Sequence, residues 1–330
     1  MDLISRPVIF DTDPGVDDAL ALLFAMAHPG IDLLGITTTF GNVSVEQASA
    51  NALLLCALTG RELPVAQGVT KPLLKQAEPP PNFIHGADGL GNLPYRALPR
   101  KQADARSAAQ FMVDTIRDQP GQVTIVAVGP LGNLALALAL EPTLPQLVRE
   151  VILMGGTIDE PGNVSPVAEA NVWNDPHAAD CVFTAGWPLT MVGLDVTHKV
   201  VVPLELMERI AAAQQHPAID ALLHAFRFYA NFYASRHVHL IEKPGCYAHD
   251  LLAFIYLLAP EFFGVERGGI RVATEGLAQG QTMMSRHHST RYPQTGWGPE
   301  LAQSQACMTV DATACIDLFE RTLMTQWLSI

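Results

Sequence analysis

Residues 11–18 read Asp11-Thr12-Asp13-Pro14-Gly15-Val16-Asp17-Asp18, and this stretch decides the fold of the chain. An apolar run at 7–10 precedes it and has the length of a strand, while an apolar helical pattern follows it as far as residue 27. Pro14 and Gly15 supply the tight turn between the two elements. The stretch therefore predicts a strand, a turn and a helix, with two aspartates ending the strand and two in the first helical turn.

Four carboxylates within these eight residues need a chemical explanation. A helix N-terminus favours one carboxylate through its dipole and free N–H groups, but like charges a few ångströms apart repel unless a cation neutralises them. Ca²⁺ takes about six to eight oxygen ligands, whereas Mg²⁺ prefers fewer carboxylates and more water. The stretch therefore predicts a calcium site within an active site. An aspartate-rich turn and helix cap without a metal is the alternative.

Composition and charge exclude several classes of function. Hydrophobic residues make up 49% of the 330 positions, which is typical of a globular protein and not of a disordered one. The formal net charge is −13 with 20 lysines and arginines, and no basic run occurs. Such a chain does not attract nucleic acid or an anionic membrane, so a small-molecule partner is expected.

The N-terminus contains no apolar segment of the signal-peptide type, and no run of about 18 apolar residues could span a membrane. The five cysteines are scattered among apolar neighbours, without the spacing of a CxxC pair or of a zinc site. These features favour reduced thiols and a cytoplasmic location.

Apolar runs of strand length alternate with longer helical patterns, which predicts βαβ units and a parallel sheet. No second core pattern restarts after the proline-rich loop at 78–81, so residues 1–330 are expected to form one α/β domain, with a mostly parallel open sheet and helices on both faces. The expected strands are 7–11, 33–39, 64–66, 123–128, 151–154 and 188–193, with a peripheral hairpin at 270–273 and 282–284. The expected helices are 17–28, 44–58, 106–118, 131–140, 175–184, 203–214, 217–239, 246–259 and 312–328.

The motif at 11–19, Asp-Thr-Asp-Pro-Gly-Val-Asp-Asp-Ala after a first strand, resembles the N-terminal signature of the nucleoside hydrolases of the inosine/uridine type. Later motifs extend the resemblance over nearly the whole chain; they include 129–133, 163–171 and the pair His249-Asp250. The resemblance implies a Rossmann-like fold, hydrolysis of the N-glycosidic bond of ribonucleosides, a role in purine or pyrimidine salvage, and a homodimer or homotetramer. The family usually has proline after the His-Asp pair, whereas this chain has Leu251.

The resemblance also implies a ligand set and two catalytic groups. The calcium ligands would be Asp11, Asp13, Asp18, the carbonyl of Val128 and Asp250. Calcium would lower the pKa of a water molecule, Asp13 would act as general base, and His249 would donate a proton to the leaving base. From the residues alone, a lone histidine at position 249 is more often structural than catalytic, and Asp250 could be a helix N-terminal acid.

Ligands of open α/β sheets bind outside the carboxyl ends of the strands, and polar residues follow the expected strands there. The resemblance implies that seven residues contact the substrate, namely Asp17, Asn42, His85, Met154, Asn163, Glu169 and Asn171. Asp17 would accept a hydrogen bond from the ribose 2′-hydroxyl, Asn171 would hold the lower hydroxyls, and Asn163 and Glu169 would hold the 5′ side. Glycines in the loop at 82–95, which carries His85, suit a loop that closes over a substrate.

Each of these residues also has an interpretation without a substrate. Asn42 could be a turn residue, His85 a surface histidine, Met154 a core residue and Glu169 a solvated loop acid. The pair Tyr229 and Tyr233 belongs to a helical aromatic stripe that is usually core, although either ring could line a base pocket. Asp195 is expected to cap the helix that follows it.

Two other functions compete with the hydrolase. A haloacid-dehalogenase-type phosphohydrolase would also place Asp-x-Asp at the end of a strand, but its motif does not continue with Pro14-Gly15. A non-catalytic nucleoside- or sugar-binding protein with structural calcium would not need the apparent base and acid. Release of reducing sugar from inosine or uridine would separate the three functions.

Overall fold

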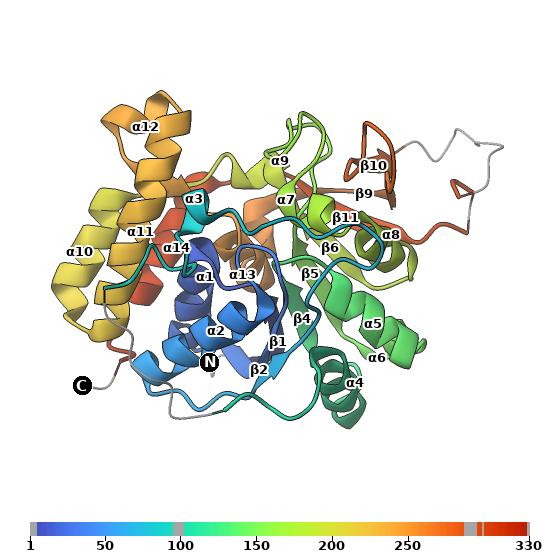
Figure 1. Ribbon diagram of the computed structural model, residues 1–330, viewed down its shortest axis with the longest axis horizontal. Helices are drawn as coiled ribbons and strands as arrows, with labels where there is room; N and C mark the ends of the chain where they lie inside the picture. The colour runs from blue at the N-terminus through green and yellow to red at the C-terminus, as the bar shows by residue number, and fades with distance from the viewer. Residues whose placement is uncertain (1–4, 95–101, 287–295, 299, 329–330) are drawn as a thin grey trace.

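In the part of the chain that the structure describes, the continuously apolar runs of the sequence form the centre of one nine-stranded sheet. The computed structural model describes residues 5–94, 102–286, 296–298 and 300–328 (Figure 1). Seven strands are parallel, in the order β11-β6-β5-β4-β1-β2-β3, and β9 and β10 extend the sheet in antiparallel fashion beside β11. The first six strands are β1 (Arg6–Thr12), β2 (Ile31–Thr38), β3 (Val65–Gln67), β4 (Thr124–Ala127), β5 (Glu150–Met154) and β6 (Leu189–Val192).

The strand order reverses between β1 and β4. The chain first builds outward from β1 to β2 and β3, and then returns to build β4, β5 and β6 on the other side of β1. Loops that leave the carboxyl ends of β1 and β4 therefore diverge and leave a crevice, which is where open α/β sheets bind their ligands. The aspartate-rich stretch follows β1 at this point.

Helices cover both faces of the sheet, because successive strand residues point to opposite sides. Phe10 packs in the core with helices α1, α2, α10, α11, α13 and α14, and its neighbour Ile9 packs in a second core with α4, α5 and α8. The bounds are α1 (Val16–Ala27), α2 (Val45–Thr59), α4 (Ala108–Asp118), α5 (Gly132–Leu140), α8 (Pro176–Thr184), α10 (Leu204–Gln214), α11 (Pro217–Arg236), α13 (Leu251–Leu258) and α14 (Ala312–Leu323). The predicted α/β class, with a mostly parallel sheet covered on both faces, is confirmed.

Short elements fill the connections. They are α3 (Asn82–His85), α6 (Leu144–Leu147), α7 (Ala170–Asn174), α9 (Leu194–Thr197), α12 (His239–Glu242) and the 3₁₀ turn η1 (Pro260–Phe262). A separate two-stranded ribbon pairs β7 (Val201–Pro203) with β8 (Gly245–Tyr247). Among the described helices, none is long and apolar enough to cross a membrane.

Three differences from the sequence prediction have physical reasons. The helix expected at 246–259 begins only at Leu251, because residues 245–247 pair with β7 as a strand. Strand β11 (Gln303–Val310) was not predicted; its mixed polar sequence is inserted between β9 and β6. The peripheral hairpin is present as β9 (Phe263–Val272) and β10 (Thr282–Ser285), although β9 begins earlier than expected. Tyr95, at the end of the predicted glycine-rich loop, lies outside the described residues.

Candidate active site

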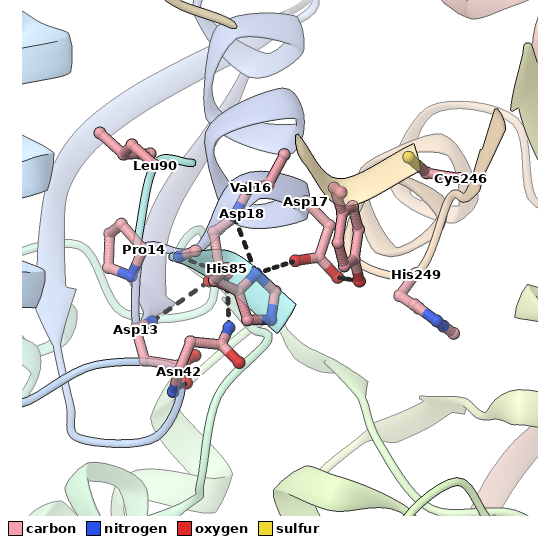
Figure 2. A network of polar contacts seen from close by, with 12 residues as sticks. Asp13, Pro14, Val16, Asp17, Asp18, Asn42, His85, Leu90, Cys246 and His249 are labelled. Atoms are coloured by element: carbon pink, nitrogen blue, oxygen red, sulfur yellow. Dashed lines mark hydrogen bonds and ion pairs between the residues drawn. The ribbon is translucent and has the colours of Figure 1, made fainter. Parts of the chain in front are cut away.

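Asp11, Asp13, Asp17 and Asp18 lie together at the strand-order reversal, as predicted. Figure 2 shows the last three beside Asn42 and His85, with His249 on the far side of Asp17. Helix α1 begins at Val16 after the Pro14-Gly15 turn, and Gly15 is its N-cap. All four aspartates are buried.

Asp18 organises the turn. Its Oδ1 accepts hydrogen bonds from the Thr12 hydroxyl and from the Asp13 amide, the latter at 3.2 Å. Its Oδ2 accepts from the Gly15 amide at 2.9 Å and from Asn42 Nδ2 at 2.9 Å. The carboxylate of Asp18 therefore satisfies helix N-terminal N–H groups and fixes the conformation of the stretch that carries the other acids.

Asp11 is held by two side chains that the sequence analysis did not identify. Thr37 Oγ1 and Asn133 Nδ2 both donate to Asp11 Oδ1, at 2.6 and 2.8 Å. Asn133 also donates to the carbonyl of Thr38 at 3.0 Å and accepts from the Val69 amide at 2.9 Å, so it joins three segments. Its position at the start of α5, just after the loop that leaves β4, was the available signal in the sequence. The second oxygen of Asp11 is buried without a hydrogen-bond partner.

Two glycines allow the backbone to approach the carboxylate of Asp13 closely. The Asn42 amide donates to Asp13 Oδ2 at 2.6 Å. A Cβ atom at Gly41 would lie 2.0 Å from that oxygen, and one at Gly129 would lie 2.6 Å from Asp13 Oδ1. Both distances are shorter than any real contact, so the two glycines permit the close approach of the backbone. Asp13 Oδ1 is buried without a hydrogen-bond partner.

Asp250 joins the cluster from the turn before α13. Carboxylate oxygens of Asp17, Asp18 and Asp250 all lie within 4.8 Å of one another, and the three residues are buried. Like Asp11 and Asp13, Asp17 has one buried oxygen, Oδ1, without a hydrogen-bond partner. Buried carboxylates without donors are costly, whereas oxygens of this kind are the preferred ligands of a hard divalent cation. These acids fit a metal site.

Burial and mutual repulsion change the acidity of the cluster. Burial raises the pKa of Asp11 from 3.8 to about 7, against the two hydrogen bonds that lower it. Burial, with the neighbouring charge of Asp18, raises the pKa of Asp17 from 3.8 to about 8. Burial raises the pKa of Asp13 and Asp250 well above the usual carboxyl range as well, with nearby aspartates adding to the shift. Without a cation, the folded protein therefore holds protons that free aspartates release.

The side chain of Asn171 bonds to backbone carbonyls at the ends of β4 and β5. Its Nδ2 donates to the carbonyl of Val128 at 2.7 Å and to the carbonyl of Met154 at 3.2 Å. A carbonyl oxygen has two lone pairs, so the bond from Asn171 leaves the Val128 carbonyl able to accept one more partner. Met154 is 3% exposed and belongs to the core, yet it also contacts the cavity described below.

Glu169 is the N-cap of α7. Its carboxylate accepts from the amides of Gly156, Asn171 and Val172 at 2.8, 2.9 and 3.1 Å, and its side chain is only 2% exposed. The alternative of a solvated loop acid is therefore wrong. The exposed Asn163 bonds through Oδ1 to the Ala170 amide at 3.0 Å, which ties its loop to the same helix.

Histidine and tyrosine side chains form a second wall beside the aspartates. His249 Nε2 lies 2.9 Å from the Tyr233 hydroxyl, which lies 3.1 Å from the Tyr229 hydroxyl. Tyr229 donates to Asp17 Oδ2 at 3.3 Å. Both tyrosines are buried, as the core interpretation predicted, but both also line the cavity described below. His85 is 4% exposed and accepts from the Val16 amide through Nδ1 at 3.2 Å, so it is not a surface histidine.

Asp195 does not cap α9, contrary to the sequence prediction. The N-cap is Gly193, and no side chain caps the helix. The carboxylate of Asp195 accepts instead from the amides of Ile158, Asp159 and Glu160, at 2.8, 2.7 and 3.1 Å. It lies in the first turn of α9 and reaches across to the loop after β5, which local sequence rules could not indicate.

One cavity of about 640 Å³ joins the two walls. It is lined by ten of the predicted site residues, namely Asp17, Asn42, His85, Val128, Met154, Asn163, Glu169, Asn171, His249 and Asp250. The remaining three, Asp11, Asp13 and Asp18, are buried at the end of β1 and the start of α1, where Asn42 contacts both Asp13 and Asp18. The fold therefore brings together every predicted site residue, from segments as distant as β1 and the turn before α13.

Comparisons with known proteins agree on one family. The sequence model described as inosine-uridine preferring nucleoside hydrolase matches residues 8–317. Uridine nucleosidase 1 of Arabidopsis thaliana is 36% identical over 322 residues, which cover 96% of this chain and 93% of the relative. The inosine-uridine preferring nucleoside hydrolase of Leishmania major is 37% identical over 309 residues, 93% of each chain.

Solved structures give the same result. A plant nucleoside hydrolase superposes with a TM-score of 0.89 at 33% identity, over 97% of this chain and 99% of its own. A purine-preferring ribonucleoside hydrolase from Gardnerella vaginalis superposes with a TM-score of 0.88 at 31% identity, over 97% and 98% of the two chains.

Proposed function

The chain belongs to the inosine-uridine preferring nucleoside hydrolases, enzymes that act on the N-glycosyl bonds of ribonucleosides, and we propose that it uses calcium and Asp13 as general base. The products are ribose and a free base. The family match and the relatives favour this function over the phosphohydrolase and the non-catalytic binding protein.

The observation that carries the calcium proposal is the set of unpartnered carboxylate oxygens. Asp11 Oδ2 and Asp13 Oδ1, which belong to two of the proposed ligands, are buried without a donor, as is Oδ1 of Asp17, which would be left for the substrate hydroxyl. A cation is the partner that would satisfy several such oxygens at once, and their number favours Ca²⁺ over Mg²⁺. Asp11, Asp13, Asp18, Asp250 and the Val128 carbonyl would hold the ion. Bound calcium would orient the ribose 2′- and 3′-hydroxyls and acidify a water molecule.

Asp13 takes the proton of the attacking water. Its Oδ2 is already engaged by the Asn42 amide, which leaves Oδ1 for this role. The new bond forms between the water oxygen and the ribose anomeric carbon, while the bond from that carbon to the base nitrogen breaks. The transition state resembles an oxocarbenium ion, so nearby carboxylate charge stabilises it.

The sugar is held from several sides. Asp17 accepts from the 2′-hydroxyl, Asn171 contacts the lower hydroxyls, and Met154 packs against the ring. Asn163 and Glu169 hold the 5′ side, and three backbone N–H donors fix the carboxylate of Glu169 in place for this contact. These assignments are supported by the cavity, which all five residues line.

Two further residues complete the sugar site. Asn42 serves the sugar mainly by holding Asp13 and Asp18 in place through its amide and side chain. His85, whose Nδ1 accepts from the Val16 amide, presents the opposite edge of its ring to the substrate.

His249 acts as general acid toward the departing base. It lines the cavity, and Figure 2 shows it beyond Asp17, away from Asp13 and Asp18, which suits a proton donor for the leaving group. Burial lowers the pKa of His249 well below its usual value. The protonated ring is therefore a stronger acid, but a smaller fraction of the molecules carries it. Leu251 follows the His-Asp pair as the first residue of α13 and is fully buried.

The relatives differ in the nucleobase that they prefer. The printed names of relatives include uridine, inosine-uridine, pyrimidine-specific and purine-preferring enzymes. We therefore expect turnover of both purine and pyrimidine ribonucleosides. A homodimer or homotetramer, a single domain over residues 1–330 and a cytoplasmic location belong to the same proposal.

A nucleoside panel tests the function. Inosine, uridine, adenosine, cytidine and guanosine would each be incubated with calcium-loaded protein, and ribose and free base would be quantified together. Equimolar release of the two products from at least one nucleoside is the expected result. Binding without release, or release of phosphate from nucleotides instead, would contradict the proposal.

A further inference from the structure

His249 makes hydrogen bonds through both ring nitrogens. On one side, Nε2 lies 2.9 Å from the hydroxyl of Tyr233, which lines the cavity. On the other side, Nδ1 lies 2.8 Å from the hydroxyl of Thr197, the last residue of α9. Thr197 is fully buried and does not line the cavity. The ring therefore has an inner nitrogen and a cavity-side nitrogen, and its function depends on which one carries hydrogen.

The hydrogen bonds that connect His249 to Asp17 through two tyrosines decide which ring nitrogen carries hydrogen. The carboxylate of Asp17 accepts from the Tyr229 hydroxyl, so the oxygen of Tyr229 is free to accept from Tyr233. The Tyr233 hydroxyl then donates its single hydrogen to Tyr229, so the oxygen of Tyr233 accepts a hydrogen bond from His249. It follows that Nε2 of His249 carries a hydrogen, and that in the neutral ring Nδ1 is an acceptor.

Thr197 completes the chain in this direction. Its hydroxyl donates to Nδ1, so every hydrogen from Thr197 to Asp17 has an acceptor. In the reverse direction His249 would donate to Thr197, whose own hydrogen would then have no acceptor among the hydrogen bonds of the described residues. An unsatisfied buried hydroxyl is unfavourable, so the arrangement in which Thr197 donates to Nδ1 of His249 is the favoured one.

We propose that Thr197 is a positioning residue, whose hydroxyl holds His249 with the Nε2–H toward the cavity. The inference rests on the proposed role of His249 in leaving-group departure. A protonated ring also carries hydrogen on Nε2, so the assignment of the cavity-side donor does not depend on the charge of the ring. Thr197 thus acts on the base through His249 and does not touch the substrate.

The substitution Thr197→Val tests this with little change of shape. We expect kcat for inosine and uridine to fall roughly tenfold, the effect of losing one orienting hydrogen bond. p-Nitrophenyl riboside has a leaving group that needs no proton, so its kcat should change less than about twofold. Thr197→Ser restores the hydroxyl and should restore nucleoside turnover. Equal slowing of both substrates, or no slowing of either, would overturn the proposal.

A matched control is Thr190→Val. Thr190 is also buried and also bonds to an aromatic side chain, the Tyr256 hydroxyl at 3.4 Å, but it lies in β6 and does not line the cavity. Its substitution should affect both substrates alike. If Thr197→Val does not fold, the spectroscopic measurement below still decides whether His249 carries hydrogen on Nε2.

Nitrogen-15 NMR of histidine-labelled full-length protein reads the tautomer directly. The signals of His249 are those that disappear in His249→Gln. A protonated Nε2 beside an unprotonated, hydrogen-bonded Nδ1 is the expected pattern, and a hydrogen on Nδ1 alone would overturn the inference. This measurement requires no turnover, so failure of the proposed function and failure of the role of Thr197 can be told apart.

Discussion

The residues of one wall of the cavity are close together in the sequence, whereas those of the other wall come from distant segments. The acid wall consists of Asp11, Asp13, Asp17, Asp18 and Asp250, and four of these five residues come from one eight-residue stretch. The base wall, named for the nucleobase that it would face, consists of Tyr229, Tyr233 and His249 from α11 and the turn before α13, with Thr197 of α9 behind His249. The acid wall is local in sequence, whereas the base wall exists only after tertiary folding.

The walls also differ in how well their polar groups are satisfied. The acid wall contains three buried oxygens without partners, together with carboxyl groups that repel one another. In the base wall every hydroxyl and both ring nitrogens of His249 have a partner. We infer that the acid wall is completed by a ligand, while the base wall is preorganised by the protein itself. The predictions below separate these two contributions.

The largest effect is expected from Asp13→Asn. Loss of the general base and of one negative ligand should lower kcat on the order of a thousandfold or more. Because Asp13 acts on water and not on the leaving group, uridine and p-nitrophenyl riboside should be slowed to the same extent. Slowing of uridine alone would place Asp13 on the base side of the reaction and contradict the division between the walls.

Removal of the ribose 2′-hydroxyl tests the acid wall from the substrate side. Buried polar groups of Asp17, Asn171 and the cation site would be left without a partner, at a cost of about 1–3 kcal/mol for each neutral group. We expect kcat/KM for 2′-deoxyinosine to be on the order of a hundredfold or more below that for inosine. Equal turnover of the two nucleosides, measured side by side, would show that the sugar is not held as proposed.

His249→Ala tests the base wall. Removal of the general acid should lower kcat for inosine by about a hundredfold, the usual contribution of such a group. The loss should shrink for p-nitrophenyl riboside, in contrast to Asp13→Asn. If His249→Ala slows both substrates equally, the residue positions the site and does not serve the leaving group.

The pH dependence of stability is expected to distinguish metal-free from calcium-loaded protein. The pKa of Asp11 is raised from 3.8 to about 7 and that of Asp17 from 3.8 to about 8. Between about pH 4 and pH 8 the unfolded chain therefore releases protons that the metal-free folded chain retains, and stability falls as pH rises. Calcium would keep these carboxylates ionised in the folded state and remove this slope.

Thermal melts at pH 5 and pH 8 measure this difference. The gap in Tm between calcium-loaded and chelated protein should widen from pH 5 to pH 8, and Asp17→Asn should reduce the slope of the chelated protein. A gap that is constant or narrows with pH would mean that the acids are not neutral in the metal-free fold.

The contrast between the walls also explains what sequence could predict. The residues from Asp11 to Asp18 span one strand end, one turn and one helix start, so spacing alone indicated the proximity and chemistry of the aspartates. The core strands were equally predictable, because buried parallel strands are continuously apolar. Asn42 follows a strand end, which placed it near the site, whereas Asn171 was assigned only by the family resemblance. The bonds of these two residues to Asp13, Asp18 and Val128 could not be foreseen.

The rest of the site depends on contacts between distant segments. Thr197 carries no motif, and its role comes from the packing of α9 against the turn before α13. Asp195 was expected to cap its own helix, but its carboxylate accepts from amides at 158–160 across the sheet end. Tyr229 and Tyr233 have the spacing of a core stripe, and only their hydroxyl partners reveal a second role.

The most direct test of the account is activity with defined metal content. The protein would be exhaustively chelated, its calcium measured by elemental analysis, and hydrolysis of inosine and uridine followed as calcium is returned. We predict loss of nearly all activity on chelation and its recovery as about one calcium per chain is bound, since five protein oxygens, four of them carboxylate, should hold the ion tightly. Full activity in protein that contains no calcium would contradict the central claim.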